Sequence, residues 1–357
     1  MRDRLLLFLG AGASAPLGVP TNENFMDDFL HAHPTYSDFW TDVRGRALEN
    51  GYSRQVDLEA AMTSIRFLGA EDRTDYLQEA AGIAPFLQNP QRSTTGMEIV
   101  EGDFDSSTAR AMTEELERFV REKCEHLDPR KLRDVYDPLL DSLSDWHPPK
   151  SVHSIANRIR IPSSLDCFTT NYDMAFETYF AKHIKQTYRD GFQEEGGNLV
   201  FKPEQLRDLG DGHRILHLHG SVEMIRLQDG RILKEKTWSI GRTQTTTYDA
   251  IEGPALIYPM LEKELARYPF PQLMAAFQES VRATQLLAFV GFSFRDLPIL
   301  RALQDGTSSE QKLVIISSSA RQVAKQIQPR VRARVIPVVG HLGESDIATK
   351  IRAEQNA

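Results

Sequence analysis

The hydrophobic positions of this chain fall into two patterns. Short apolar runs, typical of strands buried on both faces, occur at 5–9, 164–170, 214–221, 286–290, 312–317 and 334–339. Elsewhere apolar residues recur every three or four positions, as at 270–283 and 320–327, which predicts helices that cover a sheet. Strands that alternate with helices along the chain predict a Rossmann-like α/β fold, with a parallel sheet flanked by helices.

A large helical insertion interrupts this alternation. Residues 30–150 contain no convincing strand and are mainly helical in pattern, most clearly at 107–127. We therefore expect one α/β domain, built from 1–29 and 151–357, with 30–150 inserted as a helical cap over one side of its ligand cleft. A polar hairpin or flap is expected at 229–254.

Composition narrows the class of protein. With 41% hydrophobic and 26% charged residues, the 357-residue chain has an ordinary globular composition. The apolar run 5–9 leads into glycines, so we expect a core strand there and not a signal peptide.

A net charge of −8 argues against a general affinity for nucleic acid. The two cysteines, Cys124 and Cys167, are too few for a four-cysteine zinc site and are expected to be reduced in a cytoplasm.

The first strand ends in a glycine-rich turn of the form G-x-G-x-x-A. Glycines let a ligand approach the backbone closely, and N–H groups at the start of a following helix can hold a pyrophosphate. The residues that would do so, through backbone N–H groups and a hydroxyl, are Gly10, Ala11, Gly12, Ala13 and Ser14. Glycine turns also follow apolar strands for packing reasons alone, so the turn by itself leaves both interpretations open.

The spacing after this turn is not that of a conventional dehydrogenase. An ordinary dinucleotide-binding unit places an acidic residue at the end of its second strand, about 20 residues after the glycines. In this chain Asp27 and Asp28 lie inside a helical pattern that begins after Pro20. We therefore do not expect a conventional NAD-dependent dehydrogenase.

Three later strands also carry polar residues at their carboxyl ends. The first leads into Asn171 and Asp173, the second into His219, and the third into Gly291 and Ser293. Because open α/β sheets bind ligands at the carboxyl ends of their strands, these residues are candidates for one common site.

Taken in order, the segments GAGAS, TTNYD, HG and GFSFRD resemble the sirtuin-like superfamily, in particular its bacterial branch that hydrolyses NAD in defence against phage. The resemblance covers 5–25, 160–225 and 284–340. It implies an NAD+ glycohydrolase that releases nicotinamide and ADP-ribose, with NAD+ as substrate and no metal. It also implies a cytoplasmic defence effector, restrained as a homo-oligomer or by a separately encoded partner such as a HerA-type ATPase or another sensor. Direct contact with nucleic acid or with a membrane is not expected.

The same resemblance implies roles for individual residues. Asn171 would lie beside the reacting ribose and Asp173 near the nicotinamide amide. His219 would be the general base, because a neutral imidazole can accept a proton near pH 7. Thr21 corresponds loosely to a loop over the nicotinamide pocket. The second nucleotide-contacting loop would contain Gly291 and Ser293.

The residues alone leave other roles open. Asn171 can cap the helix that follows it, Ser293 can be a turn residue, and Asp296 is expected to cap the next helix. His217 stands two residues before His219, on the same face of a strand, and is expected to be packed or to act through a neighbour.

Two other functions also stay open. The first is an NAD-dependent protein deacylase or ADP-ribosyltransferase on the same fold. Deacylating sirtuins generally carry a four-cysteine zinc module, which this chain cannot form, and this argues against deacylation. The second is a non-catalytic module that binds NAD or ADP-ribose and relays that state to a partner.

Overall fold

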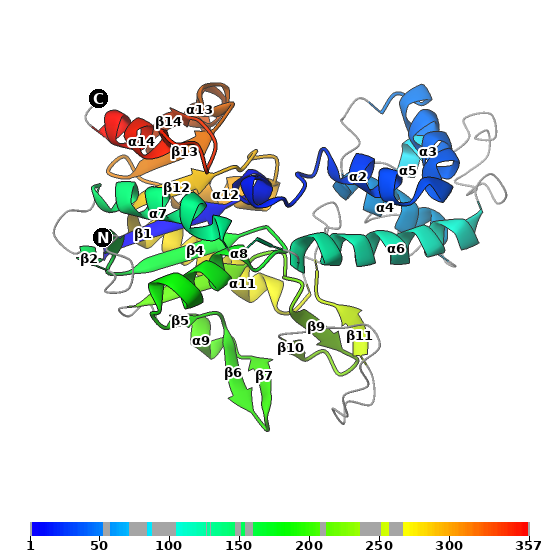
Figure 1. Ribbon diagram of the computed structural model, residues 1–357, viewed down its shortest axis with the longest axis horizontal. Coiled ribbons are helices and arrows are strands. Elements are labelled where there is room, and N and C mark those ends of the chain that lie inside the picture. The colour runs from blue at the N-terminus through cyan, green and yellow to red at the C-terminus, as the bar shows by residue number, and fades with distance from the viewer. Residues whose placement is uncertain are drawn as a thin grey trace. The chain divides into compact units, whose positions relative to one another are not determined.

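The computed structural model describes residues 2–52, 58–70, 84–87, 105–125, 127–128, 130–146, 151–153, 160–207, 212–235, 251–256 and 267–355. The chain forms two compact units (Figure 1). The sheet unit consists of Met1–Val19, Cys124–Leu256 and Tyr268–Ala357. The helical unit consists of Pro20–Lys123 and Ile257–Arg267.

A seven-stranded sheet forms the centre of the sheet unit, and each of its strand pairs is parallel. Its order is β14-β13-β12-β1-β4-β8-β5. The strands are β1 (Arg2–Leu9), β4 (Leu165–Thr169), β5 (Tyr188–Arg189), β8 (His213–His217), β12 (Thr284–Val290), β13 (Lys312–Ser317) and β14 (Arg334–Val339). The predicted fold class, a Rossmann-like parallel sheet flanked by helices, is confirmed.

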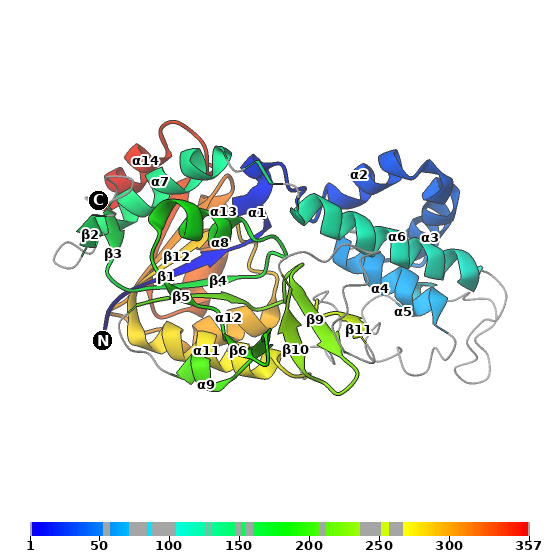
Figure 2. The same cartoon turned by 60° about the horizontal axis from the view of Figure 1, so that its bottom comes forward.

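Helices cover both faces of this sheet because the side chains of each strand alternate between the faces. Leu5, Leu7 and Leu9 share one core with α7 (Lys131–Ser144), α8 (Ala175–Tyr179) and α14 (Ile347–Gln355). On the other face, Phe8 packs edge to face on Phe277 of α11 (Phe270–Ala283), with ring centroids 5.5 Å apart. Figure 2 shows α11 on one side of the sheet and α7 and α14 on the other.

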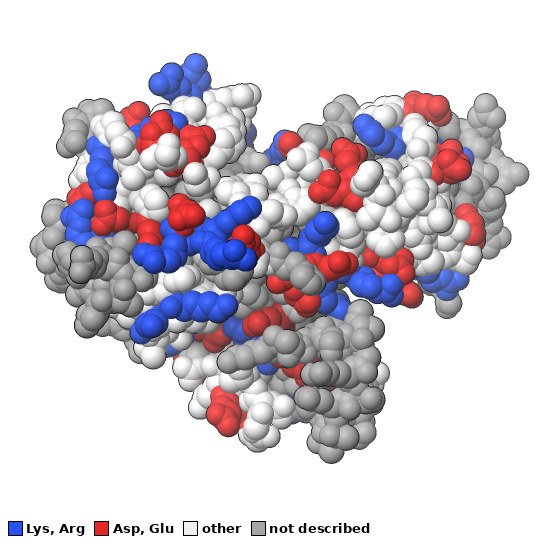
Figure 3. Space-filling model, in the orientation of Figure 1, with Lys and Arg blue, Asp and Glu red and all other residues white. Residues whose placement is uncertain are grey.

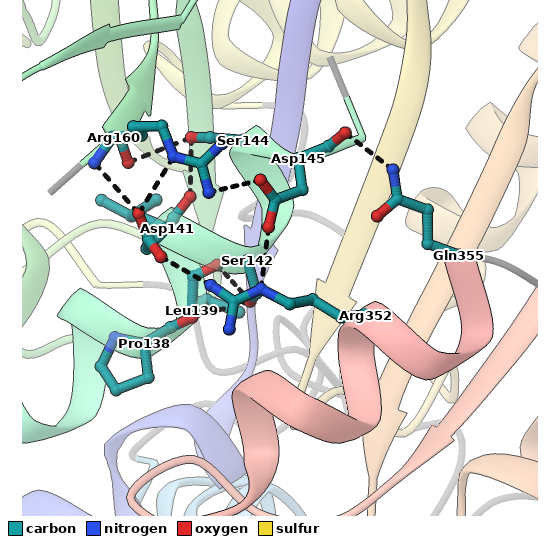
Figure 4. Close-up of polar contacts among 10 residues, drawn as sticks. Pro138, Leu139, Asp141, Ser142, Ser144, Asp145, Arg160, Arg352 and Gln355 are labelled. Carbon is teal, nitrogen blue, oxygen red and sulfur yellow. Dashed lines mark hydrogen bonds and ion pairs between the residues drawn. The ribbon is translucent and has the colours of Figure 1, made fainter. Parts of the chain in front are cut away.

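Helix α7 belongs to the sheet unit, although its residues fall within the predicted insertion 30–150. Its amphipathic pattern identifies an apolar face but does not reveal which surface that face covers. Figure 4 shows how ion pairs tie it to α14 and to β3 (Arg160–Pro162). Arg352 contacts Asp141 at 2.6 Å and Asp145 at 2.8 Å, and Arg160 also pairs with Asp145. The role of the inserted segment as a cap stays a prediction.

The remaining elements of the sheet unit surround this framework. A second, antiparallel sheet has the order β11-β9-β10-β7-β6, and its small core contains Val200, Ile225, Leu227 and Leu233. Its strands are β6 (Phe192–Glu195), β7 (Asn198–Phe201), β9 (Met224–Leu227), β10 (Ile232–Lys234) and β11 (Ile251–Pro254). The predicted flap falls partly here, and its residues 236–250 lie outside the described residues. The other elements are α1 (Ala11–Ser14), α9 (Glu204–Arg207), α12 (Leu297–Gly306), α13 (Ala320–Ile327) and β2 (Ser151–His153), which pairs with β3.

The helical unit has an aromatic core of its own. Phe119 packs edge to face on Phe25 and Phe29, with ring centroids 5.9 Å and 5.6 Å apart. Its helices are α2 (Phe25–Ala32), α3 (Ser37–Glu49), α4 (Leu58–Gly69), α5 (Ala84–Leu87) and most of α6 (Ser106–Glu125). Among the described residues of both units, no helix is long and apolar enough to cross a membrane.

Candidate functional site

The carboxyl ends of four neighbouring strands meet along one edge of the large sheet. In the register, Leu9 of β1 lies opposite Val290 of β12 and Thr169 of β4, and Thr169 lies opposite His217 of β8. The segments that follow these strands carry most of the predicted site residues, so parallel pairing brings those residues to one edge.

Backbone contacts hold the glycine turn against the loop that follows β12. The N–H of Gly10 donates to Val290 at 2.9 Å, and the N–H of Gly12 donates to the Gly291 carbonyl at 3.0 Å. A Cβ on Gly291 would lie only 2.3 Å from the nitrogen of Ala13, and its φ of +61° is left-handed. These glycines therefore have a packing reason to be there, whatever they bind.

The predicted pyrophosphate site has part of its backbone already engaged. The N–H groups of Gly10 and Gly12 donate hydrogen bonds to carbonyls of β12 and of the loop that follows it. The N–H of Ala13 donates to the Gly10 carbonyl at 2.8 Å. A phosphate at this turn would have to replace those bonds or use other donors, such as the N–H of Ala11. Pyrophosphate binding by the turn stays a prediction.

Asn171 is held by four hydrogen bonds. Its side-chain Nδ2 donates to the Gly10 carbonyl at 3.0 Å and to the Ser14 hydroxyl at 2.9 Å. Its backbone N–H donates to Thr169 Oγ1 at 2.9 Å, and its carbonyl lies 2.9 Å from His217 Nδ1. Both amide protons are thus used, which leaves the side-chain Oδ1 as the acceptor. The side chain is half-buried.

The alternative role of Asn171 as a helix cap is wrong. Helix α8 has Met174 at its N-cap position, without a side-chain cap bond. Asp173 takes the local backbone bond instead, because its Oδ1 accepts from the N–H of Ala175 at 3.0 Å. The side chain of Asn171 points to the glycine turn, which belongs to a strand 161 residues away in sequence.

The Ser14 hydroxyl links the side chains of Asn171 and Asp173. The Ser14 hydroxyl accepts a bond from Asn171 and donates one to Asp173. Asp173 is only 5% exposed, and burial raises the pKa of its carboxyl despite the bonds from Ser14 and Ala175. Asp173 therefore supports the side chain of Asn171 through Ser14, and its predicted place near the nicotinamide amide stays a prediction.

His217 acts on Asn171 from the neighbouring strand. Its Nε2 pairs with the Glu177 carboxylate of α8, while its Nδ1 faces the carbonyl of Asn171. Burial alone would lower the pKa of the imidazole, but Glu177 outweighs it and the pKa is raised. Burial likewise opposes the charge of Glu177, yet His217 lowers the pKa of that carboxyl. The sequence predicts a packed or indirectly acting His217 but holds no signal for Glu177.

His219 lies beside Asp296, the residue that was expected to cap a helix. That cap is confirmed, because Asp296 Oδ1 accepts from the N–H of Ile299 at 3.1 Å at the start of α12. Its other oxygen, Oδ2, lies 3.0 Å from His219 Nε2. Burial alone would raise the pKa of Asp296, but the contact with His219 lowers it. The sequence could not reveal this second contact.

Ser293 and Thr21, the remaining predicted site residues, belong to different units of the chain. Ser293 is exposed on the loop between β12 and α12. Thr21 belongs to the helical unit, where its carbonyl accepts from the N–H groups of Asn24 and Phe25, each at 3.0 Å. The ligand contacts proposed for both residues stay predictions.

A small cavity is lined in part by His217. Its volume is about 10 Å³, room for about one water. The residues that line it are Asp190, Phe192, Phe201, Ile215, His217, Ser221, Met224, Lys234 and Leu273. Lys234 is paired with Asp190 at 2.7 Å, and this carboxylate outweighs burial and raises the pKa of the lysine. A dinucleotide cannot enter this cavity, so the strand ends themselves remain the candidate site.

The described residues supply no metal site, and charges of both signs lie on the surface. Within the described ranges, no group of three His, Cys, Asp or Glu side chains can hold a metal ion. Both cysteines are buried free thiols, and burial raises the pKa of each. In Figure 3, Lys and Arg side chains lie among Asp and Glu side chains, and ion pairs such as Arg133 with Asp137 at 3.2 Å join the two signs.

One comparison with known proteins, the family-model match, agrees with the sirtuin-like resemblance. A family model described as a SIR2-like domain matches residues 166–334, a range that includes Asn171, His219 and Gly291. A search of curated proteins finds no match. One similar solved structure is a Sir2 homologue in complex with NAD, which is 13% identical, with 99% of this chain and 90% of that chain covered and a TM-score of 0.44. Another is a mutant Sir2 homologue in complex with ADP-ribose, which is 12% identical, with 99% and 93% covered and a TM-score of 0.44. The family-model match supports a sirtuin-like family, and the bacterial defence branch stays a prediction.

Proposed function

We propose that this chain, which matches a SIR2-like family model over residues 166–334, binds NAD+ at the ends of β1, β4, β8 and β12 and hydrolyses it to nicotinamide and ADP-ribose. The observation that carries the proposal is the fixed orientation of Asn171. Its amide protons are engaged by the Gly10 carbonyl and the Ser14 hydroxyl, which leaves Oδ1 as an acceptor beside the sheet edge.

The register of the sheet supports a shared site for Asn171 and His219. Thr169 of β4 lies opposite His217 of β8. Asn171 comes two residues after Thr169, and His219 comes two residues after His217. Neighbouring strands lie about 4.8 Å apart, so residues at equivalent positions past their ends begin close together. The N–H of Leu218 donates to the Thr169 carbonyl at 2.8 Å, which continues the pairing beyond β8.

The chemistry suits an amide oxygen and an imidazole. Cleavage of the bond between nicotinamide and ribose passes through a cation-like sugar, as in other glycoside hydrolyses. Nicotinamide leaves as a neutral molecule, because it takes the electron pair of the bond that breaks. Asn171 Oδ1 would accept a hydrogen bond from the attacking water, and His219 would take the proton of that water. Ser14 and Asp173 would hold Asn171 in place.

The remaining predicted residues would bind the nucleotide. The turn of Gly10, Ala11, Gly12, Ala13 and Ser14 would approach the pyrophosphate, and Gly291 and Ser293 would contact phosphate or ribose from the next loop. Thr21 would contribute from a loop over the nicotinamide. These assignments rest on the resemblance and on the position of the sheet-unit residues at one strand edge.

The test is the release of nicotinamide from NAD+ by the purified chain, followed by chromatography. Asn171→Ala and His219→Ala should each lower kcat by about 10²-fold or more, because positioned acid–base groups contribute 10²–10⁴-fold. His31→Ala, an exposed histidine of the helical unit, is the matched control and should keep full activity. Full turnover by both site variants would refute the assignment. Binding of ADP-ribose without turnover would point to a sensing module instead.

We further propose that the reaction serves anti-phage defence in the cytoplasm. An enzyme that destroys NAD+ must be restrained at rest, so a homo-oligomer or a separately encoded partner, such as a HerA-type ATPase or another sensor, would control it. The test is NAD+ consumption by the isolated chain, by the chain with its partner, and in infected cells. Loss of NAD+ that does not depend on infection would argue against the defence role.

A further inference from the structure

We propose that Asp296, besides capping α12, is a positioning residue that fixes the His219 ring so that Nε2 carries the proton and Nδ1 is the base. This inference rests on the proposed NAD+ hydrolysis. Asp296 Oδ2 lies 3.0 Å from His219 Nε2, and the side chains are only 9% and 3% exposed. A carboxylate this well buried needs polar partners, and His219 is its ionisable partner.

The position of Asp296 is determined by the start of α12. Its Oδ1 is engaged by the N–H of Ile299, so only Oδ2 is directed toward His219. The ten-residue helix also contributes the partial positive charge of its N-terminus, which stabilises a carboxylate there. The carboxylate therefore reaches His219 from a rigid element.

The loop before Asp296 is held by aromatic packing. Phe294 has a left-handed φ of +57°, a conformation that is unfavourable for a residue with a side chain. Its ring stacks on Phe289, with centroids 5.1 Å apart, and Phe292 packs on Phe8 at 4.7 Å. Such strain persists where the surrounding packing imposes it, often at functional sites. Here the consequence is that Asp296 is presented to the end of β8.

The contact between His219 and Asp296 is close in distance but not well directed. Nε2 makes no well-aligned hydrogen bond to a described residue, although Asp296 Oδ2 is within 3.0 Å. Catalytic hydrogen bonds are often poorly aligned before substrate binds and tighten in the complex. A rotation of the His219 ring would align this one.

The neighbouring His217 provides an internal contrast. Both of its ring nitrogens are engaged, one by Glu177 and the other by the Asn171 carbonyl, so it has no lone pair to offer a substrate. In His219 only Nε2 faces a carboxylate, and no described residue bonds to Nδ1. Two histidine–carboxylate pairs at one strand end thus have different roles. His217 holds Asn171, and His219 can accept a proton.

In the proposed hydrolysis, water replaces nicotinamide on the ribose and His219 takes up a proton. The bond from the ribose C1′ to nicotinamide breaks, and its electron pair leaves with nicotinamide. The oxygen of water bonds to C1′, and one of its protons passes to Nδ1 of His219. Asp296 stabilises the imidazolium that forms, as a carboxylate does in other nucleophile–histidine–carboxylate sites. The proton is finally released to solvent.

Asp296→Asn tests the proposal, because asparagine keeps the helix cap but removes the charge. We expect kcat for NAD+ hydrolysis to fall at least about tenfold, with KM nearly unchanged and the acidic limb of kcat/KM moved toward lower pH. The melting temperature should stay near that of the wild type. Asp305→Asn, an exposed position on the same helix, is the matched control and should change none of these.

A second readout does not require turnover. The ¹⁵N NMR signals of His219, assigned with His219→Gln, report which ring nitrogen carries the proton. We expect Nε2 in the wild-type chain and a shift toward Nδ1 in Asp296→Asn. If the chain hydrolyses no NAD+ but this change is seen, the pair stands and the proposed function fails. An unchanged tautomer together with an unchanged pH profile would overturn the role of Asp296.

Discussion

At the strand ends, the lack of a side chain at Gly291 allows two backbone segments to pack closely. Its backbone lies directly against the glycine turn, where a Cβ would come within 2.3 Å of Ala13 and 2.4 Å of Gly12. The sequence left packing and ligand binding open for these glycines. The contacts establish a packing role, which does not exclude a ligand, because a close backbone approach suits both.

We predict that Gly291→Ala destabilises the chain more than Gly196→Ala. Both glycines have a φ of +61°, but a Cβ on Gly196 would meet nothing within 4 Å. The shared left-handed conformation costs about 1–2 kcal/mol in each variant. The clash should add to that loss only at Gly291. Urea unfolding measures both, and equal losses would contradict the clash.

The buried pair of His217 and Glu177 predicts a pH dependence of stability. The pKa of His217 is raised above 6.5, so its contribution is full below that pH and is lost as the pH rises through the folded value. The pKa of Glu177 is lowered below 4.5, so its contribution is full above that pH and is lost as the pH falls through the folded value. The pair should stabilise most between pH 4.5 and pH 6.5.

Glu177→Gln checks this dependence. Because breaking a buried ion pair leaves an uncompensated charge, the free energy of unfolding should fall by about 3 kcal/mol within that pH window and by less above it. Denaturant unfolding across the pH range, with the exposed Glu310→Gln as control, provides the comparison. A loss that does not vary with pH would contradict the pairing.

At the scale of elements, the amino-terminal halves of the central strands are joined by a buried charge cluster. Asp166 of β4 accepts two bonds from Arg214 of β8, at 2.7 Å and 2.6 Å, and one from Arg4 of β1 at 2.8 Å. Burial opposes the charge of Asp166, but Arg214 lowers the pKa of its carboxyl. This cluster lies at the other end of β4 from Asn171.

We therefore predict that Asp166→Asn affects stability and not the site directly. It would leave two buried guanidinium groups without their carboxylate, so the free energy of unfolding should fall by about 3–5 kcal/mol. Asp229→Asn, which removes an exposed ion pair, is the control and should have little effect. Chemical denaturation measures both, and a loss no larger than that of the control would contradict the prediction.

Helix α7 illustrates what an element's pattern leaves undecided. Its period identifies Leu132, Leu139 and Leu143 as buried, and they are. Their partners are Leu5 and Leu7 of β1, more than a hundred residues away in sequence. The period of a helix depends on neighbouring residues alone, whereas its partner surface depends on the path of the whole chain.

For the whole molecule, two compact units with separate cores predict separate responses to a ligand. If ADP-ribose binds the strand ends, at 100 times its Kd it should stabilise the sheet unit by about 2.7 kcal/mol. Hydrogen exchange should show protection at Gly291 and Asn171 and little change in the core around Phe119. Protection near Thr21 would support its proposed loop role. A change confined to the helical unit would contradict binding at the strand ends.

By itself, the sequence held no signal for the two-residue β5, but it determined the other six strands of the large sheet and the polar residues that follow them. These are local properties, because an apolar run and the residue after it need no knowledge of the rest of the fold. Only the tertiary structure decided the partners of those residues: Ser14 for Asn171, Glu177 for His217 and Asp296 for His219. Each partnership joins segments that are distant in sequence, so it depends on strand order and register, which no local pattern specifies.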